Sequence, residues 1–426
     1  MKKVIFTLLA IIIACHVTQA QFDKYFMKKT LRFDFYHCGT HDTEEYFFDE
    51  LKAEPYWGGS REYLIDDTGY GKQMFKIIDK ASGKVIYSRS YNTLFNEWQD
   101  TEEAKHNNKA MPESVVFPYP KNAVTIEIYS RNKKGEFVKK FSQDIDPNSY
   151  AIRQFAPQYE TFDVAYTGDA AQRVDLVLIP EGYAANEKEK FMAACENFAK
   201  EFFSFSPYKE LAQKFNVRAV WAPSKDSGVS LPGENIWRNT VNKAQFYTFF
   251  SERYQMIEDF QNVRDIAAHV PYDYIYVLSN TQKYGGGGIY NFYGISAAHH
   301  PESTGKIYVH EFGHVLLGLA DEYVGTTSYN DMYAHNVEPW AENLTVLKDF
   351  AKTKKDWKNM IHDSIPIPTP AIEKYKNVVG VFEGGGYAKE GIYRPCITCL
   401  MKDFSTREFC PVCKNAIIKH VNRLCK

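Results

Sequence analysis

The pentapeptide HEFGH at residues 310–314 constrains this chain more than any other feature of its sequence. On an α-helix His310 and His314 lie one turn apart on the same face, so both imidazoles can bind one metal ion. Glu311 then lies beside that ion. The pattern predicts a Zn²⁺ site in which the metal makes a water molecule more acidic and Glu311 takes its proton. The chemistry that it implies is hydrolysis of a peptide bond.

The residues around the pentapeptide predict that it lies on a buried helix. The segment GKIYVHEF (305–312) leads into it, and the apolar run 315–317 follows it. Such residues bury well in a core, but helix packing alone does not require two histidines and a glutamate among them. The alternative is an ordinary core helix with two hydrogen-bonded histidines. We favour the metal site.

A catalytic zinc ion keeps three protein ligands and one open position, so a third ligand is expected after the helix. Gly318 is placed to end the helix with a left-handed turn, and Asp321 follows three residues later. Asp321 is therefore the predicted third ligand. Glu322 is its close competitor, and Glu338 or Glu342 would suit a gluzincin-like arrangement with a more distant ligand.

Several segments together resemble the IgA-peptidase family M64 of secreted bacterial metallopeptidases. They are HEFGHVLLGLADEY (310–323), VDLVLIPEGY (174–183), YGGGGIYNFYGIS (284–296) and a cysteine-flanked methionine near the C-terminus. The resemblance spans residues 155–426 and implies a metzincin-like zinc-peptidase domain with an acidic third ligand. In metzincins Gly-x-x-His follows the helix histidines; here the glycine and the ligand lie one residue later, and Asp321 replaces the histidine.

The strand and helix patterns predict an α+β protein of more than one domain. Residues 21–150 carry alternating runs and two hairpin patterns, GKQMFKIIDKASGKVIYSRSY and NAVTIEIYSRNKKGEFVKKF, which favour a β-sandwich accessory domain. In residues 151–426, strands at 174–180, 215–223 and 272–280 alternate with helical runs such as 187–203. We expect this second part to be an α/β metallopeptidase domain with a mixed sheet and an active-site helix.

Residues 1–20 have the pattern of a signal peptide. Lys2 and Lys3 precede an apolar run, and the chain can be cleaved after Ala20. The expected location is therefore periplasmic, cell-surface or extracellular. A lipid anchor through Cys15 is the alternative, because the residues before it approximate a lipobox. No other stretch approaches about 18 apolar residues, so no transmembrane span is expected.

The net charge of the chain indicates which classes of binding partner to expect. A formal net charge of −2 over 426 residues does not favour nucleic acid. We expect protein or peptide substrates, and the family name suggests immunoglobulin, with host glycoproteins equally open.

Two other functions stay open: a non-catalytic glycan- or protein-binding surface protein with a vestigial zinc helix, and a zinc amidase that acts on a non-protein substrate. The intact HEFGH pentapeptide weighs against the first.

The C-terminal end carries a cysteine cluster, Cys396-x2-Cys399 and Cys410-x2-Cys413. This spacing is typical of a structural zinc site, but export favours disulfides, which could cross between the two pairs. A second, structural zinc is the alternative. Met401 lies between the pairs. The family resemblance implies a methionine turn beneath the catalytic metal, and the alternative is a methionine that only fills the core.

A glycine run precedes the predicted zinc helix. It lacks the Lys-Ser/Thr of a phosphate-binding loop, so we expect Gly286, Gly287 and Gly288 to form a strand edge that pairs with an extended substrate. A flexible hairpin is the alternative. His299 and His300 are adjacent in sequence and cannot replace a pair spaced four residues apart. They are expected to be loop residues near the cleft.

Overall fold

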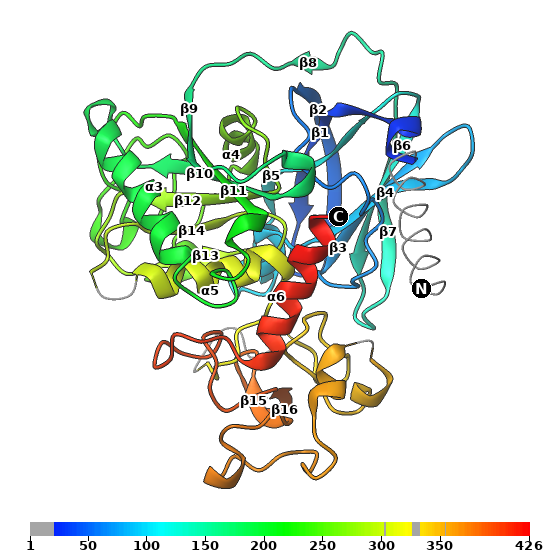
Figure 1. Cartoon of the computed structure of the whole chain (residues 1–426). Helices are drawn as coiled ribbons and strands as arrows, with labels where there is room; N and C mark the ends of the chain where they lie inside the picture. Colours follow the sequence, from blue (N-terminus) through cyan, green and yellow to red (C-terminus); the bar gives the residue numbers. More distant parts are fainter. Residues whose placement is uncertain (1–20, 302–303, 326–332, 354) are drawn as a thin grey trace, which may run out of the picture.

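The computed structural model describes residues 21–301, 304–325, 333–353 and 355–426. The predicted signal peptide and Cys15 lie outside these residues. Within the described part of the chain, no helix is long and apolar enough to cross a membrane. Figure 1 shows an N-terminal pair of sheets beside a layered α/β unit, with a smaller lobe below them. The protein is thus a multi-domain chain of mixed α and β structure.

Two four-stranded sheets form the N-terminal part. The first has the order β5-β1-β2-β8 and comprises β5 (Lys109–Pro120), β1 (Phe26–Gly39), β2 (Glu44–Glu54) and β8 (Arg153–Gln154). The second has the order β4-β3-β6-β7 and comprises β4 (Val85–Tyr91), β3 (Gln73–Asp79), β6 (Val124–Arg131) and β7 (Phe137–Ile145). The two predicted hairpins are the antiparallel pairs β3–β4 and β6–β7.

The two sheets share one aromatic core, as expected for a sandwich. Alternate residues of β6 are buried, because successive side chains of a strand point to opposite faces. Across the core, the rings of Phe75 and Phe117 lie 6.4 Å apart and those of Phe33 and Phe141 lie 5.9 Å apart. Strand β8 lies just beyond the predicted boundary at residue 150, yet it pairs with β2 and so belongs to the first sheet.

A six-stranded mixed sheet with the order β13-β14-β12-β10-β11-β9 forms the second part. Its inner strands β14 (Gly294–Ala297), β12 (Tyr274–Ser279), β10 (Val174–Glu181) and β11 (Phe215–Trp221) are parallel. The edge strands β13 (Gly286–Gly288) and β9 (Glu160–Ala165) are antiparallel to their neighbours. Every residue of β10 and β12 is buried, because both faces of the sheet are covered.

Helices cover the two faces differently. One face carries α3 (Lys188–Phe202), α5 (Thr304–Leu317) and α6 (Pro411–Leu424), and the other carries α4 (Phe260–Ala267) and α2 (Leu94–Gln99). Tyr276 of β12 packs on Phe198 of α3, with ring centroids 4.9 Å apart. Its neighbour Val277 shares the opposite core with Trp98 of α2. The N-terminal part therefore supplies one wall of this core.

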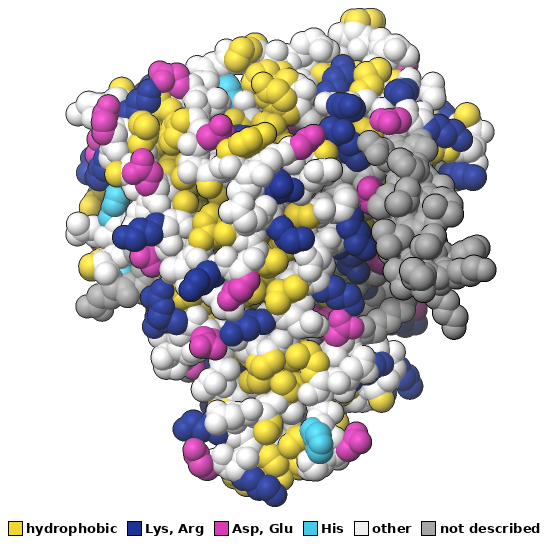
Figure 2. Space-filling view, viewed as in Figure 1, with side chains coloured by type: hydrophobic (Ala, Val, Ile, Leu, Met, Phe, Trp, Pro, Cys, Tyr) yellow, Lys and Arg dark blue, Asp and Glu magenta, His cyan; other side chains and the backbone are white. Residues whose placement is uncertain are grey.

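A smaller lobe lies between α5 and α6 in the sequence. It contains the hairpin of β15 (Phe382–Gly385) and β16 (Ala388–Arg394), and α6 then returns from it to the sheet (Figure 1). The lobe has a small apolar core of its own around Leu344 and Ile392. On the face drawn in Figure 2, positive and negative side chains are interspersed, and hydrophobic side chains lie in small groups among them.

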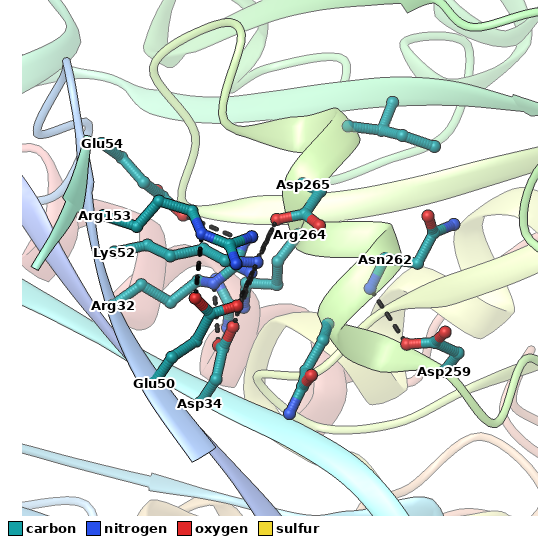
Figure 3. A network of polar contacts seen from close by, with 12 residues as sticks. Arg32, Asp34, Glu50, Lys52, Glu54, Arg153, Asp259, Asn262, Arg264 and Asp265 are labelled. Carbon is teal, nitrogen blue, oxygen red and sulfur yellow. Dashed lines mark hydrogen bonds and ion pairs between the residues drawn. The ribbon is translucent and has the colours of Figure 1, made fainter. Parts of the chain in front are cut away.

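A buried charge network joins the sandwich to α4 (Figure 3). Arg32 of β1 is buried and donates to Asp34, at 2.8 Å from Nε and 2.6 Å from Nη2. The same Nη2 lies 2.7 Å from Asp265 of α4, and Nη1 lies 3.5 Å from the buried Glu54. One guanidinium therefore balances carboxylates from both parts of the chain.

We expect Arg32→Met to lower the free energy of unfolding by about 3–5 kcal/mol, because the buried Asp34 and Glu54 lose their nearest cation and Lys52, 3.5 Å from Asp34, replaces it only in part. Urea unfolding measures the loss. The matched control is Arg153→Met, which removes an ion pair with Glu50 from a side chain that is 67% exposed. That control should cost less than about 1 kcal/mol. Equal losses in the two variants would contradict the role assigned to Arg32.

Candidate metal centre

Helix α5 presents His310, Glu311 and His314 to a cleft because its other face is fixed in the core. Tyr308, Phe312 and Val315 are fully buried against the sheet and its helices. His310 and His314 lie one turn apart on the remaining face, with their Nε2 atoms 3.2 Å apart. The predicted helix and the predicted orientation of its histidines are both present.

Three donor atoms converge at this face. The Oδ1 atom of Asp321 lies 3.1 Å from His310 Nε2 and 3.5 Å from His314 Nε2. Donor atoms around a tetrahedral zinc with nitrogen and oxygen ligands lie about 3.3 Å apart. The spacing of the three atoms therefore fits a zinc ion, and His310, His314 and Asp321 form one of the groups that could hold a metal.

Backbone carbonyls determine which ring nitrogen of each imidazole carries a hydrogen. His310 Nδ1 lies 3.0 Å from the Leu400 carbonyl oxygen, and His314 Nδ1 lies 2.5 Å from that of Leu319. A carbonyl only accepts hydrogen bonds, so each Nδ1 carries a hydrogen, and each Nε2 faces the third residue, where loss of its proton frees a lone pair for a metal. This is the arrangement in which histidine binds a metal.

The Asp321 carboxylate is also prepared for a cation. Oδ2 accepts a hydrogen bond from the Tyr387 hydroxyl, whereas the buried Oδ1 faces the two imidazole Nε2 atoms and makes no other polar contact with the described residues. Burial raises the pKa of Asp321, but His314 and His310 outweigh burial and hold it well below its usual range. Burial lowers the pKa of His314, and Asp321 outweighs this and raises it to about 9. Without a metal, protons on the imidazoles balance the carboxylate.

The turn after α5 brings Asp321 to the histidines. Gly318 has a φ of +64°, and its N–H donates to the His314 carbonyl at 2.8 Å, which ends the helix in a left-handed turn. The Asn343 side chain then holds the segment by two hydrogen bonds to the backbone of Ala320, at 2.9 and 2.8 Å. Asn343 was not predicted from the sequence, because nothing local marks its distant partner.

The alternative third ligands lie elsewhere. Glu322 points away from the histidines and lies 3.3 Å from the Cys413 sulfur. Glu338 forms an ion pair of 2.7 Å with Lys355, and Glu342 accepts a hydrogen bond of 3.0 Å from the Tyr70 hydroxyl. Of the four acidic candidates, the structure brings only Asp321 to the histidine pair.

A turn at residues 400–401 lies beneath the site. Met401 is fully buried, and a Cβ at Gly313 would lie 3.1 Å from its sulfur, so the methionine packs on α5 between the two histidines. The Met401 carbonyl accepts from the Glu322 N–H at 2.8 Å. With the Leu400 carbonyl on His310, this turn contacts both the helix and the segment that carries Asp321.

A cleft of about 560 Å³ opens over these residues. Its lining includes His310, Glu311 and Asp321, the glycine run 285–288, and Glu97 of the N-terminal part. Glu97 was not predicted from the sequence, because α2 lies more than two hundred residues before the helix that carries the histidines. Burial raises the pKa of Glu97 to about 7, against the hydrogen bond that it accepts from the Tyr254 hydroxyl.

Comparison with known protein families shows to which family the chain belongs. The family model described as IgA Peptidase M64 matches residues 162–377 and 371–421, and the one described as Peptidase M64 N-terminus matches residues 21–142. The chain belongs to the IgA peptidase M64 family. This confirms the resemblance drawn from the sequence, and the family implies a metallopeptidase. No curated protein matches the chain.

The glycine run of this M64 chain lets β13 approach α5 closely. A Cβ at Gly288 would lie 2.3 Å from the Glu311 carbonyl oxygen, and one at Gly287 would lie 2.5 Å from the Met256 sulfur. The run thus has a packing role that no flexible hairpin would need. Strand β13 lies at the sheet edge and lines the cleft, although Gly286 already forms a parallel bridge with Tyr254. Pairing with substrate stays a prediction.

We expect Gly288→Ala to destabilise the protein by about 1–3 kcal/mol and to lower activity, since the new methyl group meets backbone that cannot move aside. Thermal unfolding and peptide cleavage measure the two effects. The control is Gly83→Ala, where φ is +66° but no atom lies within 4 Å of the added Cβ. That variant should cost about 1 kcal/mol with unchanged activity. A Gly288→Ala protein as active as the control would exclude the tight contact.

The adjacent histidines of the M64 domain lie outside the metal-binding group. His299 Nε2 lies 3.1 Å from the Tyr183 hydroxyl, and the His300 ring packs edge-on against Tyr284, which lines the cleft. His300 is therefore near the cleft, as expected, whereas the expected position of His299 near the cleft stays a prediction.

The cysteines differ from the expectation of disulfides. All seven cysteines in the described part of the chain are free. Cys399 and Cys413 come from different pairs, but their sulfurs are 3.9 Å apart, far beyond the length of about 2.05 Å that a disulfide bond requires. The predicted crossing between the pairs is present as a contact and absent as a bond.

Proposed function

We propose that this M64 chain is a zinc-dependent endopeptidase that hydrolyses peptide bonds with Glu311 as general base. The observation that carries the proposal is the convergence of His310, His314 and Asp321 at the floor of a cleft that Glu311 also lines. Two neutral imidazoles and one carboxylate are the kind of ligand set that catalytic zinc takes.

The chain's own residues supply the acid–base chemistry. When bound, the zinc would polarise a water molecule and the substrate carbonyl. Glu311 takes a proton from the attacking water and delivers it to the leaving amine, so that one carboxylate serves both steps. Tyr387 holds the second oxygen of Asp321, and the Leu400 and Leu319 carbonyls hold the imidazoles, so the ligands need not reorganise during the reaction.

The arrangement supports a metzincin-like site. The helix ends at Gly318, the third ligand follows in the next turn, and Met401 packs beneath the helix between the two histidines. An acidic ligand in place of the third histidine lowers the positive charge of the site. We propose Met401 as the equivalent of the methionine floor that the family resemblance implies.

The proposed substrates are extracellular proteins. The family description names immunoglobulin A, so immunoglobulin or other host glycoproteins are the first candidates. Export through residues 1–20, with a lipid anchor at Cys15 as the alternative, would bring the enzyme to them. A cleft of about 560 Å³ can accept several residues of an extended chain.

The test is incubation of residues 21–426 with denatured proteins and with peptide pools, followed by mass spectrometry of the new termini. We expect new internal termini that appear with zinc and vanish after chelation. A zinc-loaded protein that cleaves no peptide would overturn the proposal. Binding of glycans or proteins without cleavage would then favour the binding-protein function, and release of amines from a non-protein amide would favour the amidase.

A further inference from the structure

We propose that Glu322, Cys399, Cys410 and Cys413 bind a second zinc ion at a site separate from the catalytic one. Their donor atoms all lie within 4.8 Å of one another. All four residues belong to one chain, and Cys399 precedes Met401 by two residues.

The distances fit zinc rather than a disulfide. Around a tetrahedral zinc, two thiolate sulfurs lie about 3.8 Å apart, and a sulfur and an oxygen lie about 3.5 Å apart. The sulfurs of Cys399 and Cys413 are 3.9 Å apart, and the Cys413 sulfur is 3.3 Å from Glu322 Oε1. Three thiolates and one carboxylate are a donor set that suits zinc.

Burial gives an independent reason for a cation here. Glu322 is fully buried, and its Oε2 atom has no hydrogen-bond partner among the described residues. Oε1 accepts a hydrogen bond of 2.9 Å from Asn343. The nearby Arg394 interacts electrostatically with this carboxylate, but its donors go to the carbonyls of Glu383 and Gly384, and it forms no described hydrogen bond or ion pair with Glu322. A buried carboxylate with an unused oxygen is unfavourable unless a cation or a proton satisfies it.

The backbone around Cys410 and Cys413 places partial positive charge next to the sulfurs, as it does in metal sites with thiolate ligands. Cys410 occupies the N-cap of α6, Pro411 follows it, and Cys413 lies in the first turn, where the positive end of the helix favours a thiolate. The Cys410 N–H points at the Cys399 sulfur, at 3.3 Å. Backbone donors of this kind orient and stabilise metal-bound sulfurs.

The structure changes the ligand set that the sequence suggested. Cys396 also contacts Cys410, but it lies outside the group of four whose donor atoms converge, and its sulfur lies 3.7 Å from the Val378 carbonyl oxygen. Glu322 takes its place, which the spacing of the two cysteine pairs could not reveal.

This second site would hold the catalytic centre in place. Glu322 follows Asp321 directly, and its N–H donates to the Met401 carbonyl. The Leu400 carbonyl accepts from His310. Zinc bound to Glu322 and Cys399 would therefore fix the segment with the third ligand and the turn beneath the histidines, so its ligands act as positioning residues.

The test begins with residues 21–426 purified without chelators. We expect two zinc ions per chain, and thiols that are alkylated rapidly only after chelation. Replacement of zinc by cobalt should give the thiolate-to-cobalt absorption in the near ultraviolet, which the histidine site cannot produce. A single zinc with a non-reduced mass two hydrogens below the thiol form would show a disulfide and overturn the proposal.

Matched variants test the ligand set. Cys413→Ser and Glu322→Gln should each lower zinc from two ions to one and weaken the thiolate-to-cobalt absorption, whereas Cys396→Ser should keep both. His310→Ala should lose the zinc ion of the histidine site and keep the thiolate-to-cobalt absorption of the cysteine site. The two measurements therefore distinguish a failure of the proposed catalytic site from a failure of the second site. Loss of the signal in Cys396→Ser with retention in Glu322→Gln would overturn the assignment of Glu322.

Discussion

Glu311→Gln should lower kcat by roughly 10² to 10⁴-fold while the protein keeps its metal and its fold. Glutamine has nearly the same shape as glutamate but cannot take a proton from the attacking water. Glu311 is not among the three side chains whose donor atoms converge, so zinc content should be unchanged. Steady-state kinetics on a cleaved peptide, with metal analysis of the same sample, measure both quantities.

The matched control is Glu97→Gln, which removes another carboxylate of the same cleft. Because Glu97 is held by Tyr254 and not by the histidine group, we expect a change in KM with kcat reduced less than about tenfold. A Glu311→Gln protein with near-normal kcat would exclude Glu311 as the base.

Asp321→Ala should remove most of the catalytic metal and reduce activity at least as much as Glu311→Gln. The substitution deletes the oxygen that lies 3.1 Å from His310 Nε2 and leaves two ligands where catalytic zinc requires three. Competition with a chelator, followed by peptide cleavage at increasing zinc, measures the loss of affinity. Added zinc should restore activity only in part.

Glu342→Gln is the control for this prediction, since Glu342 was an alternative third ligand on sequence grounds. It lies in the smaller lobe on Tyr70, so its replacement should leave both zinc and activity near normal. Normal zinc binding in Asp321→Ala, or its loss in Glu342→Gln, would contradict the ligand assignment.

Some residues of the candidate site could be predicted because their relations are local. The i, i+4 spacing fixed the histidine pair on one helix face, and alternation of apolar residues indicated the sandwich hairpins and the buried parallel strands. Gly318 indicated the turn, which favoured Asp321 as the third ligand over Glu322, Glu338 and Glu342. The sequence could not exclude the neighbouring Glu322, because only the folded chain shows Asp321 at the histidines and Glu322 at Cys413.

The sequence by itself determined the M64 family, the HEFGH helix, the division into a strand-rich and an α/β part, and the cysteine pairs. Only the tertiary structure decided which acid joins the histidines, that Glu97 reaches the cleft, and that Glu322 joins the cysteines. The reason is distance along the chain: the Leu400 carbonyl is 90 residues from His310, and Cys413 is 91 residues from Glu322. Spacing patterns describe one element at a time, whereas packing against the sheet brings these groups together.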